Sequence, residues 1–196
     1  MTTQPASGTL ICLDASFAGT LLLPEPLTAG ADALWESWAQ REWRIIAPPH
    51  FGAEVVSSVR RASMRGRITP EKEAVALEAS LTRVWPTVEI VTITPRAWRR
   101  AWEWAREMNR AGIYDTLYLA VAEAAGAEFW TTDENLVRAL EAGGWPLPDW
   151  VRLATGCASP PGEAGRPSRE AAPRLGAPRH RVRRAAQVGR PLPDWV

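Results

Sequence analysis

The sequence predicts an α/β fold built around a mostly parallel sheet of four to five strands. Short apolar runs rich in β-branched residues recur along the chain, and stretches of helical character separate them. Strands that alternate with helices are typical of parallel sheets, because a parallel connection needs a crossover segment. Two of the strand-to-helix junctions carry an aspartate, Asp14 and Asp133. The functional crevice of such sheets lies beyond the carboxyl ends of the strands.

The first half of the chain predicts two strands, each followed by helices. TLICLDAS (9–16) predicts a short buried strand that ends at Asp14, and a helix follows to about Leu23, where two prolines stop it. RIIA (44–47) predicts the second strand. Thr-Pro at 69–70 suits a helix start, because the hydroxyl can cap the helix and proline fits its first turn. The other predicted helices cover 28–42, about 51–65 and about 69–84.

The second half predicts up to three more strands. VEIVTI (88–93) is rich in β-branched residues, which favour strands. Thr-Pro at 94–95 opens a helix to about Arg110, and Gly112 suits its C-terminal cap. The remaining predicted elements are a helix at 114–125 that ends at Gly126, a strand at 127–132, a helix from Asp133 to about Gly143, and an edge strand at 150–154.

Composition favours a cytoplasmic protein with one folded domain. The chain has 196 residues, of which 46% are hydrophobic, and no apolar run reaches the roughly 18 to 20 residues of a membrane helix. MTTQPASG at the start lacks the basic and apolar segments of a secretory signal. We therefore expect no membrane association. Two cysteines and two histidines provide almost no ligands for zinc.

After Ala154 the pattern of strands and helices stops. Residues 155–196 are rich in Pro, Gly, Ala and Arg, which predicts a disordered tail behind a domain at 1–154. The hexapeptide PLPDWV occurs at 146–151 and again at 191–196. Either this repeat is a duplication or an altered reading frame without function, or the second copy competes for the docking place of the first. Deletion of 155–196 would distinguish the two.

Four scattered carboxylates are the candidate catalytic groups: Asp14, Glu54, Asp115 and Asp133. Hydrolysis of a phosphodiester needs stabilisation of charge on the phosphate and a hydroxide near neutral pH. Mg²⁺ or Mn²⁺ held by carboxylates supplies both. Carboxylates in one cleft repel each other, by roughly 3 kcal/mol per pair at about 5 Å and an effective dielectric constant near 20. A divalent ion would relieve this repulsion.

Each carboxylate also has a purely structural explanation. Asp14 and Asp133 could cap the helices that follow them, and Asp115 favours the helix dipole from a first turn. Glu54 could be a half-exposed residue of an ordinary helix. Their placement, however, is shared: two end strands, one opens a helix, and Glu54 follows a strand and a Pro-Pro turn. All four could therefore point to one end of the sheet.

Over about residues 9–154 the chain resembles the PIN-domain ribonucleases, and specifically the VapC-type toxins of bacterial toxin–antitoxin pairs. The resemblance rests on LDAS around Asp14, on Pro49 followed by Glu54, and above all on YDTLYLAVAEAAGAEFWTTDENL (114–136). In this last segment a Tyr-Asp helix start and an Ala-rich helix precede a strand that ends in Thr-x-Asp. The Pro/Arg-rich tail and the eleven tryptophans depart from the family pattern.

The resemblance implies a PIN-like three-layer α/β/α fold and a metal-dependent endoribonuclease that acts as a toxin. The four carboxylates would be the catalytic residues and the ligands of Mg²⁺ or Mn²⁺. Ser16 and Thr131 match positions where the family often has a hydroxyl near the site. The implied partners are an RNA substrate, a second copy in a homodimer, and a cognate antitoxin that covers the active site.

Arginines and tryptophans offer candidate surfaces for these partners. On a helix, positions 54, 58, 61 and 65 share a face, so Arg61 and Arg65 either line a groove that leads RNA to the metal or form an ordinary solvated face. Trp98 and Trp102 are four residues apart, which predicts that they lie on the packed face of their helix, with Trp104 off that face. Some tryptophans could instead form a partner surface.

Two other classes of α/β protein also gather acids at strand ends. A receiver domain needs a lysine near the end of its last core strand, but the only lysine here, Lys72, falls in the first turn of a predicted helix. A phosphatase of the haloacid dehalogenase type needs Asp-x-Asp, but Asp14 is followed by Ala15 and Ser16. The remaining alternative is a catalytically silent PIN-like module that binds RNA or protein. An RNA cleavage assay with Mg²⁺, Mn²⁺ and a chelator distinguishes it.

Overall fold

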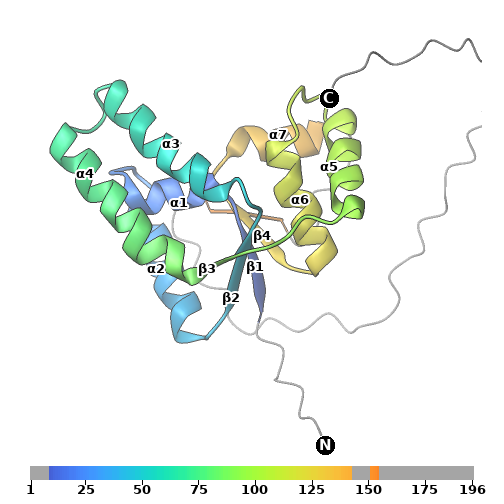
Figure 1. The fold of residues 1–196 in the computed structure, drawn as a ribbon, viewed down its shortest axis with the longest axis horizontal. Helices are drawn as coiled ribbons and strands as arrows, with labels where there is room; N and C mark the ends of the chain where they lie inside the picture. Colours follow the sequence, from blue (N-terminus) through green and yellow to red (C-terminus); the bar gives the residue numbers. More distant parts are fainter. Residues whose placement is uncertain (1–8, 143–150, 155–196) are drawn as a thin grey trace, which may run out of the picture. The chain divides into compact units, whose positions relative to one another are not determined.

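Five parallel strands form one sheet in the computed structural model, which describes residues 9–142 and 151–154 (Figure 1). The strands pair in the order β3-β2-β1-β4-β5. They are β1 (Leu10–Leu13), β2 (Arg44–Ala47), β3 (Val88–Ile90), β4 (Glu128–Thr131) and β5 (Val151–Leu153). The predicted edge strand is therefore confirmed, and all four pairings are parallel. The tail at 155–196 and most of both PLPDWV copies lie outside the described residues.

Helices cover both faces of this sheet, which confirms the three-layer α/β/α arrangement (Figure 1). On one side are α1 (Ala15–Leu22), α2 (Thr28–Gln40), α3 (Phe51–Met64) and α4 (Pro70–Ala79), and on the other are α5 (Pro95–Glu107), α6 (Tyr114–Ala125) and α7 (Glu134–Ala142). One π-helical turn (Ser80–Val84) and one 3₁₀ turn (Trp85–Thr87) continue α4 to the start of β3. No helix within the described ranges is both long and apolar enough to span a bilayer.

The strand order reverses between β1 and β4. The chain first moves outward from β1 through β2 to β3, and then crosses over to β4 on the other side of β1. At such a reversal the connections from the two neighbouring strands leave toward opposite faces, which opens a crevice at their carboxyl ends. Asp14 directly follows β1, and Asp133 lies two residues after β4. The topology thus brings both aspartates to the crevice.

Helix ends follow the sequence signals at most positions. The hydroxyls of Thr69 and Thr94 accept hydrogen bonds from the backbone N–H groups of Lys72 and Ala97, as predicted for caps. Gly126 ends α6 with the left-handed φ of 63°. The α5 helix starts as predicted, but the prediction for its C-terminal end was wrong.

The α5 helix ends at Glu107, three residues earlier than predicted, and Gly112 does not cap it. Asn109 instead takes the left-handed conformation, with φ of 50°. The backbone N–H of Arg110 then donates to the carbonyl of Ala105 at 2.8 Å, which closes a Schellman motif. Asparagine tolerates this conformation better than other residues with a side chain.

The tryptophans on α5 also correct the sequence prediction. Trp98 and Trp102 are 45% and 54% exposed, whereas Trp104 is only 3% exposed. Small residues fill most of the buried face of α5, and Ala101 clusters with Leu117 and Ala120 of α6. Alanines let the two helix backbones approach closely, so the large Trp98 and Trp102 side chains lie outside.

Trp38 of α2 links the sheet to the helices near the crevice. Its ring stacks on Phe17 of α1 with 5.1 Å between centroids, and meets Trp130 of β4 edge-on at 5.1 Å. Such aromatic pairs stabilise a fold beyond the area that they bury. Trp38 therefore supports the two elements, α1 and β4, that flank Asp14.

We expect Trp38→Ala to lower the free energy of unfolding by about 3–5 kcal/mol, because the side chain is 1% exposed and its removal leaves a cavity. Urea unfolding followed by circular dichroism measures the change. The matched control is Trp98→Ala on the outer face of α5, for which we expect about 0.5 kcal/mol or less. Equal losses in both variants would contradict this account of the core.

Candidate active site

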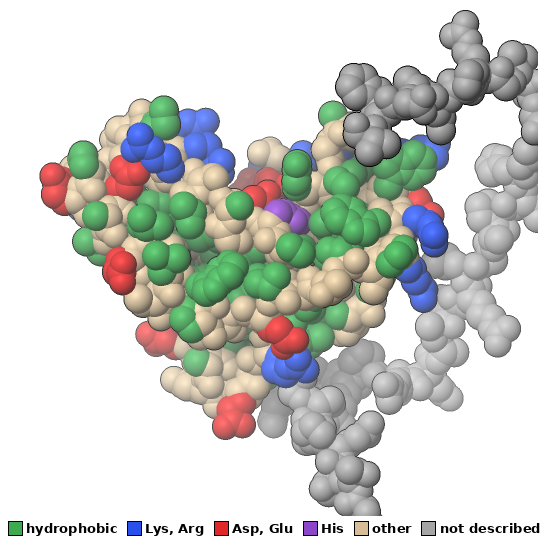
Figure 2. Space-filling view, viewed as in Figure 1, with side chains coloured by type: hydrophobic (Ala, Val, Ile, Leu, Met, Phe, Trp, Pro, Cys, Tyr) green, Lys and Arg blue, Asp and Glu red, His purple; other side chains and the backbone are tan. Residues whose placement is uncertain are grey.

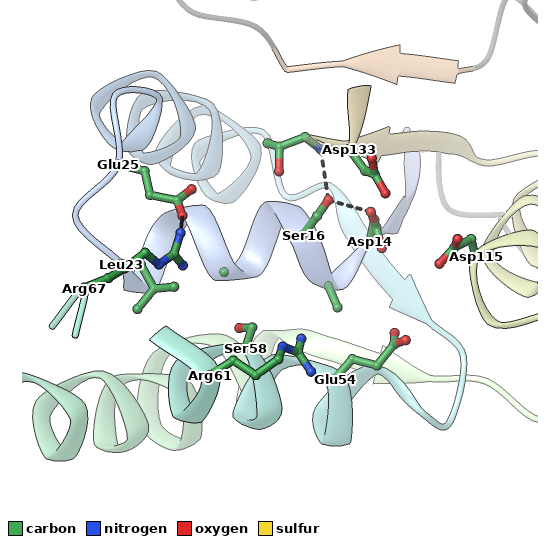
Figure 3. A pocket seen from close by; sticks show the side chains of 13 residues that line it. Asp14, Ser16, Leu23, Glu25, Glu54, Ser58, Arg61, Arg67, Asp115 and Asp133 are labelled. Atoms are coloured by element: carbon green, nitrogen blue, oxygen red, sulfur yellow. Dashed lines mark hydrogen bonds and ion pairs between the residues drawn. The ribbon is translucent and has the colours of Figure 1, made fainter. Parts of the chain in front are cut away.

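A cavity of about 310 Å³ lies at the crevice between β1 and β4. Its lining comes from α1, α3, α6, the segment after β4 and the loops that follow α1 and α3 (Figure 3). The four predicted carboxylates all line it. Its polar and charged lining residues are Asp14, Ser16, Glu25, Glu54, Ser58, Arg61, Arg67, Asp115, Thr132 and Asp133.

Asp14 occupies the N-cap position of α1, yet its side chain makes no capping hydrogen bond. One carboxylate oxygen, Oδ2, instead accepts hydrogen bonds from Ser16 Oγ at 2.5 Å and from Thr131 Oγ1 at 2.6 Å. The backbone N–H of Asp14 donates to the carbonyl of Trp130 at 3.0 Å, which extends the pairing of β1 with β4. A simple capping role thus does not explain Asp14.

Asp133 combines the capping role with a place in the cavity. Its Oδ1 accepts hydrogen bonds from the backbone N–H groups of Asn135 and Leu136, at 2.8 and 3.2 Å, at the start of α7. Its own N–H donates to Thr131 Oγ1 at 2.9 Å. Thr131 therefore joins Asp133 to Asp14. The cap fixes the carboxylate at the rim of the crevice.

Glu54 reaches the cavity from the first turn of α3. Its Oε2 accepts a hydrogen bond of 2.7 Å from the hydroxyl of Tyr118, a buried residue of α6, and lies 3.7 Å from His50 Nε2. Tyr118 was missed from the sequence. It lies three residues after Asp115, hence on the same face of α6, and this spacing was the available signal.

Asp115 lies in the first turn of α6 and is half-exposed. Its Oδ2 is 3.6 Å from Arg110 Nη1. The Schellman motif at the end of α5 places Arg110 there, and its Nη2 also donates to the carbonyl of Asn135 at 3.2 Å. Arg110 thus offsets part of the negative charge of the cavity.

The carboxylates raise each other's pKa. Burial raises the pKa of Asp14 from 3.8 to about 6, and the charges of Asp115 and Glu54 add to the rise, while the hydroxyls of Ser16 and Thr131 oppose it. Burial is also the main cause that raises the pKa of Glu54 and of Asp115 above their usual values. The cavity thus favours a bound proton or a cation.

Among the described residues, two arginines line the cavity, and one of them, Arg61, was a candidate from the sequence. Arg61 of α3 lies beside Ser58, and its charge lowers the pKa of Glu54. Arg65 follows the last residue of α3 and is not among the residues that line the cavity, which favours the solvated face of the two alternatives for it. Arg67 lines the cavity in its place.

The donor set suits a hard cation, although the side chains need to move to hold one. Within 9–142 and 151–154, no three acidic, histidine or cysteine side chains stand as a ready metal cluster. One carboxylate oxygen each of Asp14, Glu54 and Asp133 accepts hydrogen bonds from the hydroxyl and amide donors described above. Four carboxylates on one cavity still provide the oxygen ligands that Mg²⁺ and Mn²⁺ prefer.

The fold and the cavity define a class: a three-layer α/β protein with an acidic site where its parallel sheet reverses order. Residues 11–141 match the PIN domain family, and the chain belongs to this family. The predicted resemblance is thereby confirmed.

Among its relatives are two ribonucleases of Mycobacterium tuberculosis. Ribonuclease VapC3 is 38% identical over 101 residues, which are 51% of this chain and 64% of VapC3. The match thus spans less than two thirds of that relative. Ribonuclease VapC12 is 30% identical over 132 residues, which are 66% of this chain and 91% of VapC12.

Solved structures of similar fold include M. tuberculosis VapC20, a toxin that cleaves the sarcin–ricin loop. It shares 22% identity, with a TM-score of 0.49, and the alignment covers 66% of this chain and 94% of VapC20. FitAcB from Neisseria gonorrhoeae also has a TM-score of 0.49, at 17% identity.

The raised pKa of Asp14 predicts a pH-dependent stability. The protonated carboxyl favours the folded chain, so its contribution is fully present below about pH 4 and is lost as the pH rises through about 6. In a chelating buffer, the free energy of unfolding of the wild type relative to Asp14→Asn should fall by about 2 kcal/mol between pH 4 and pH 7. Urea unfolding at several pH values measures the difference, and a difference that does not change with pH would contradict the assignment.

Proposed function

We propose that the chain is a metal-dependent endoribonuclease that hydrolyses RNA phosphodiester bonds and acts as the toxin of a toxin–antitoxin pair. The observation that carries the proposal is the convergence of Asp14, Glu54, Asp115 and Asp133, from four separate elements, on one cavity. Membership of the PIN domain family and the similarity to ribonucleases VapC3 and VapC12 support it.

The four carboxylates are the proposed ligands of Mg²⁺ or Mn²⁺. When bound, the ion stabilises charge on the phosphate and lowers the pKa of a water molecule. The chain positions the ligands through neighbouring groups. Ser16 and Thr131 orient the carboxylate of Asp14, and Tyr118 orients that of Glu54. Loss of such supporting hydrogen bonds typically lowers metal affinity or activity by roughly 10- to 100-fold.

The proposed partners are RNA, a second copy of the chain and an antitoxin, and the proposed location is the cytoplasm. Exposed apolar side chains offer contact area for protein partners. Figure 2 shows such side chains gathered along α4 and the turns after it. The large exposed ones in this segment are Val75, Leu77, Leu81 and Trp85.

RNA cleavage tests the proposed function directly. Full-length protein with Mg²⁺ or Mn²⁺ should cleave single-stranded RNA, and a chelator should stop the reaction. Asp115→Asn should lower the rate roughly 100-fold or more, because it removes a ligand charge. Asp32→Asn is the matched control, since Asp32 pairs with Arg83 on the surface of α2 and does not line the cavity. A wild type that binds RNA but never cleaves it would instead identify a silent module.

The thermal stability of the protein provides a separate measure of metal binding. Millimolar Mg²⁺ or Mn²⁺ should raise the melting temperature by a few degrees, because ligands that bind only the folded state stabilise it by mass action. The shift should shrink in Asp14→Asn and in Asp115→Asn, while Asp32→Asn keeps it. If millimolar metal leaves the wild-type melting temperature unchanged, the carboxylates are not a metal site.

A further inference from the structure

The cavity has a second charged end, which the four carboxylates do not account for. Figure 3 shows Leu23, Glu25 and Arg67 together at one end, with Glu54 and Asp115 at the other. Arg67 Nη1 lies 3.4 Å from Glu25 Oε1, and Arg61 lies between the two ends. Among the described lining residues, Arg61 and Arg67 are the cationic ones.

The end of α3 holds Arg67 in this position. Gly66 has a left-handed φ of 68°, and its N–H donates to the carbonyl of Ser63 at 2.9 Å. The N–H of Arg67 donates to the carbonyl of Ala62 at 2.9 Å. These two bonds form a Schellman motif, which reverses the chain direction after the helix. The motif returns Arg67 to the cavity, whereas Arg65, two residues earlier, stays outside.

Glu25, which lies between Pro24 and Pro26, is also held in position by hydrogen bonds. Its N–H donates to Thr28 Oγ1 at 3.0 Å, and its Oε2 accepts a hydrogen bond of 3.2 Å from Thr20 Oγ1. Thr20 Oγ1 is also 3.3 Å from Thr132 Oγ1, next to Asp133. Hydroxyl contacts thus connect Glu25 to the rim of the crevice that carries the carboxylates.

The ion pair between Glu25 and Arg67 is weak enough for another anion to displace Glu25 from Arg67. It is a single long contact, and the Arg67 side chain is 54% exposed. Ion pairs of this kind contribute about 0.2–1 kcal/mol. A phosphate can take two parallel N–H bonds from one guanidinium, which makes it the stronger partner for arginine.

Apart from its arginines, the cavity repels an RNA strand electrostatically. Five carboxylates of the described residues line the cavity, including Glu25, and each repels the phosphates of the strand. A metal ion compensates at the end that carries Asp14. At the other end, Arg67 is the group that can receive a phosphate, once Glu25 releases it.

We propose that the Glu25 carboxylate occupies the position beside Arg67 that an RNA phosphate takes when RNA binds. This end of the cavity is then a phosphate subsite for a nucleotide that flanks the cleaved bond. The inference rests on the proposed function, because it takes RNA as the substrate. Binding of the strand replaces the Glu25–Arg67 pair with a phosphate–Arg67 pair. Glu25 is then an internal competitor for RNA, and Arg67 is a binding residue.

The test measures binding of a fluorescein-labelled single-stranded RNA of mixed sequence by fluorescence anisotropy. It uses the full chain, in chelator and again in Ca²⁺. Arg67→Gln should weaken binding roughly tenfold and lower the salt dependence by about one counterion. Arg65→Gln is the matched control and should change the affinity less than about twofold. Glu25→Gln should tighten binding up to about fivefold, which is the weight of the pair that it removes.

A double-variant cycle separates competition from simple charge effects. In the Arg67→Gln background, Glu25→Gln should tighten binding less than about twofold, because only the direct repulsion between Glu25 and the strand remains to be removed. RNAs with one neutral methylphosphonate linkage should identify a position at which neutralisation weakens binding to the wild type but not to Arg67→Gln.

Three results would overturn the subsite: equal affinities of Arg67→Gln and Arg65→Gln, equal tightening by Glu25→Gln in both backgrounds, or no linkage position specific to Arg67. Failure of the proposed function looks different. A wild type that shows the full binding pattern but leaves RNA uncut with Mg²⁺ and Mn²⁺ would contradict the nuclease and retain the subsite.

Discussion

The pairing of β1 with β4 is the constraint on which the site depends. It joins segments more than a hundred residues apart and places Asp14 beside Thr131, with 2.6 Å between the carboxylate and the hydroxyl. Asp115 reaches the cavity from α6, which packs against both strands, and Glu54 reaches it from α3, which packs against α1. Trp38 stabilises the same junction, because it contacts both Phe17 on α1 and Trp130 on β4.

Much of the fold could be predicted from local patterns, because apolar runs, threonine caps and proline stops report the periods and ends of elements directly. Which residues form the buried face of α5 could not be predicted in this way. Hydrophobicity favours burial of Trp98 and Trp102, but close packing of α5 against α6 favours alanine at the contact. Which of these effects prevails depends on the distance between two helices, and the sequence of one helix does not contain that distance.

The carboxylates could be named from the sequence, but their partners could not. Helical spacing grouped Arg65 with Glu54 and Arg61, and this argument fails where the helix ends. Both Arg67 and Arg110 follow a residue in the left-handed conformation, Gly66 and Asn109. The same backbone motif therefore brings one arginine into the cavity and the other to Asp115. Tyr118 was within reach of prediction, since it shares a helix face with Asp115.

The late position of β4 in the chain has a consequence for biosynthesis. While the ribosome is still translating the segment before residue 128, β1 can pair with β2 on one edge, but its other edge has no partner strand. Asp14 then lacks the hydroxyl of Thr131, and Asp133 does not yet exist. A product that stops early is consequently unable to assemble the acidic cavity. The complete site therefore forms only after nearly all of the described domain has emerged from the ribosome.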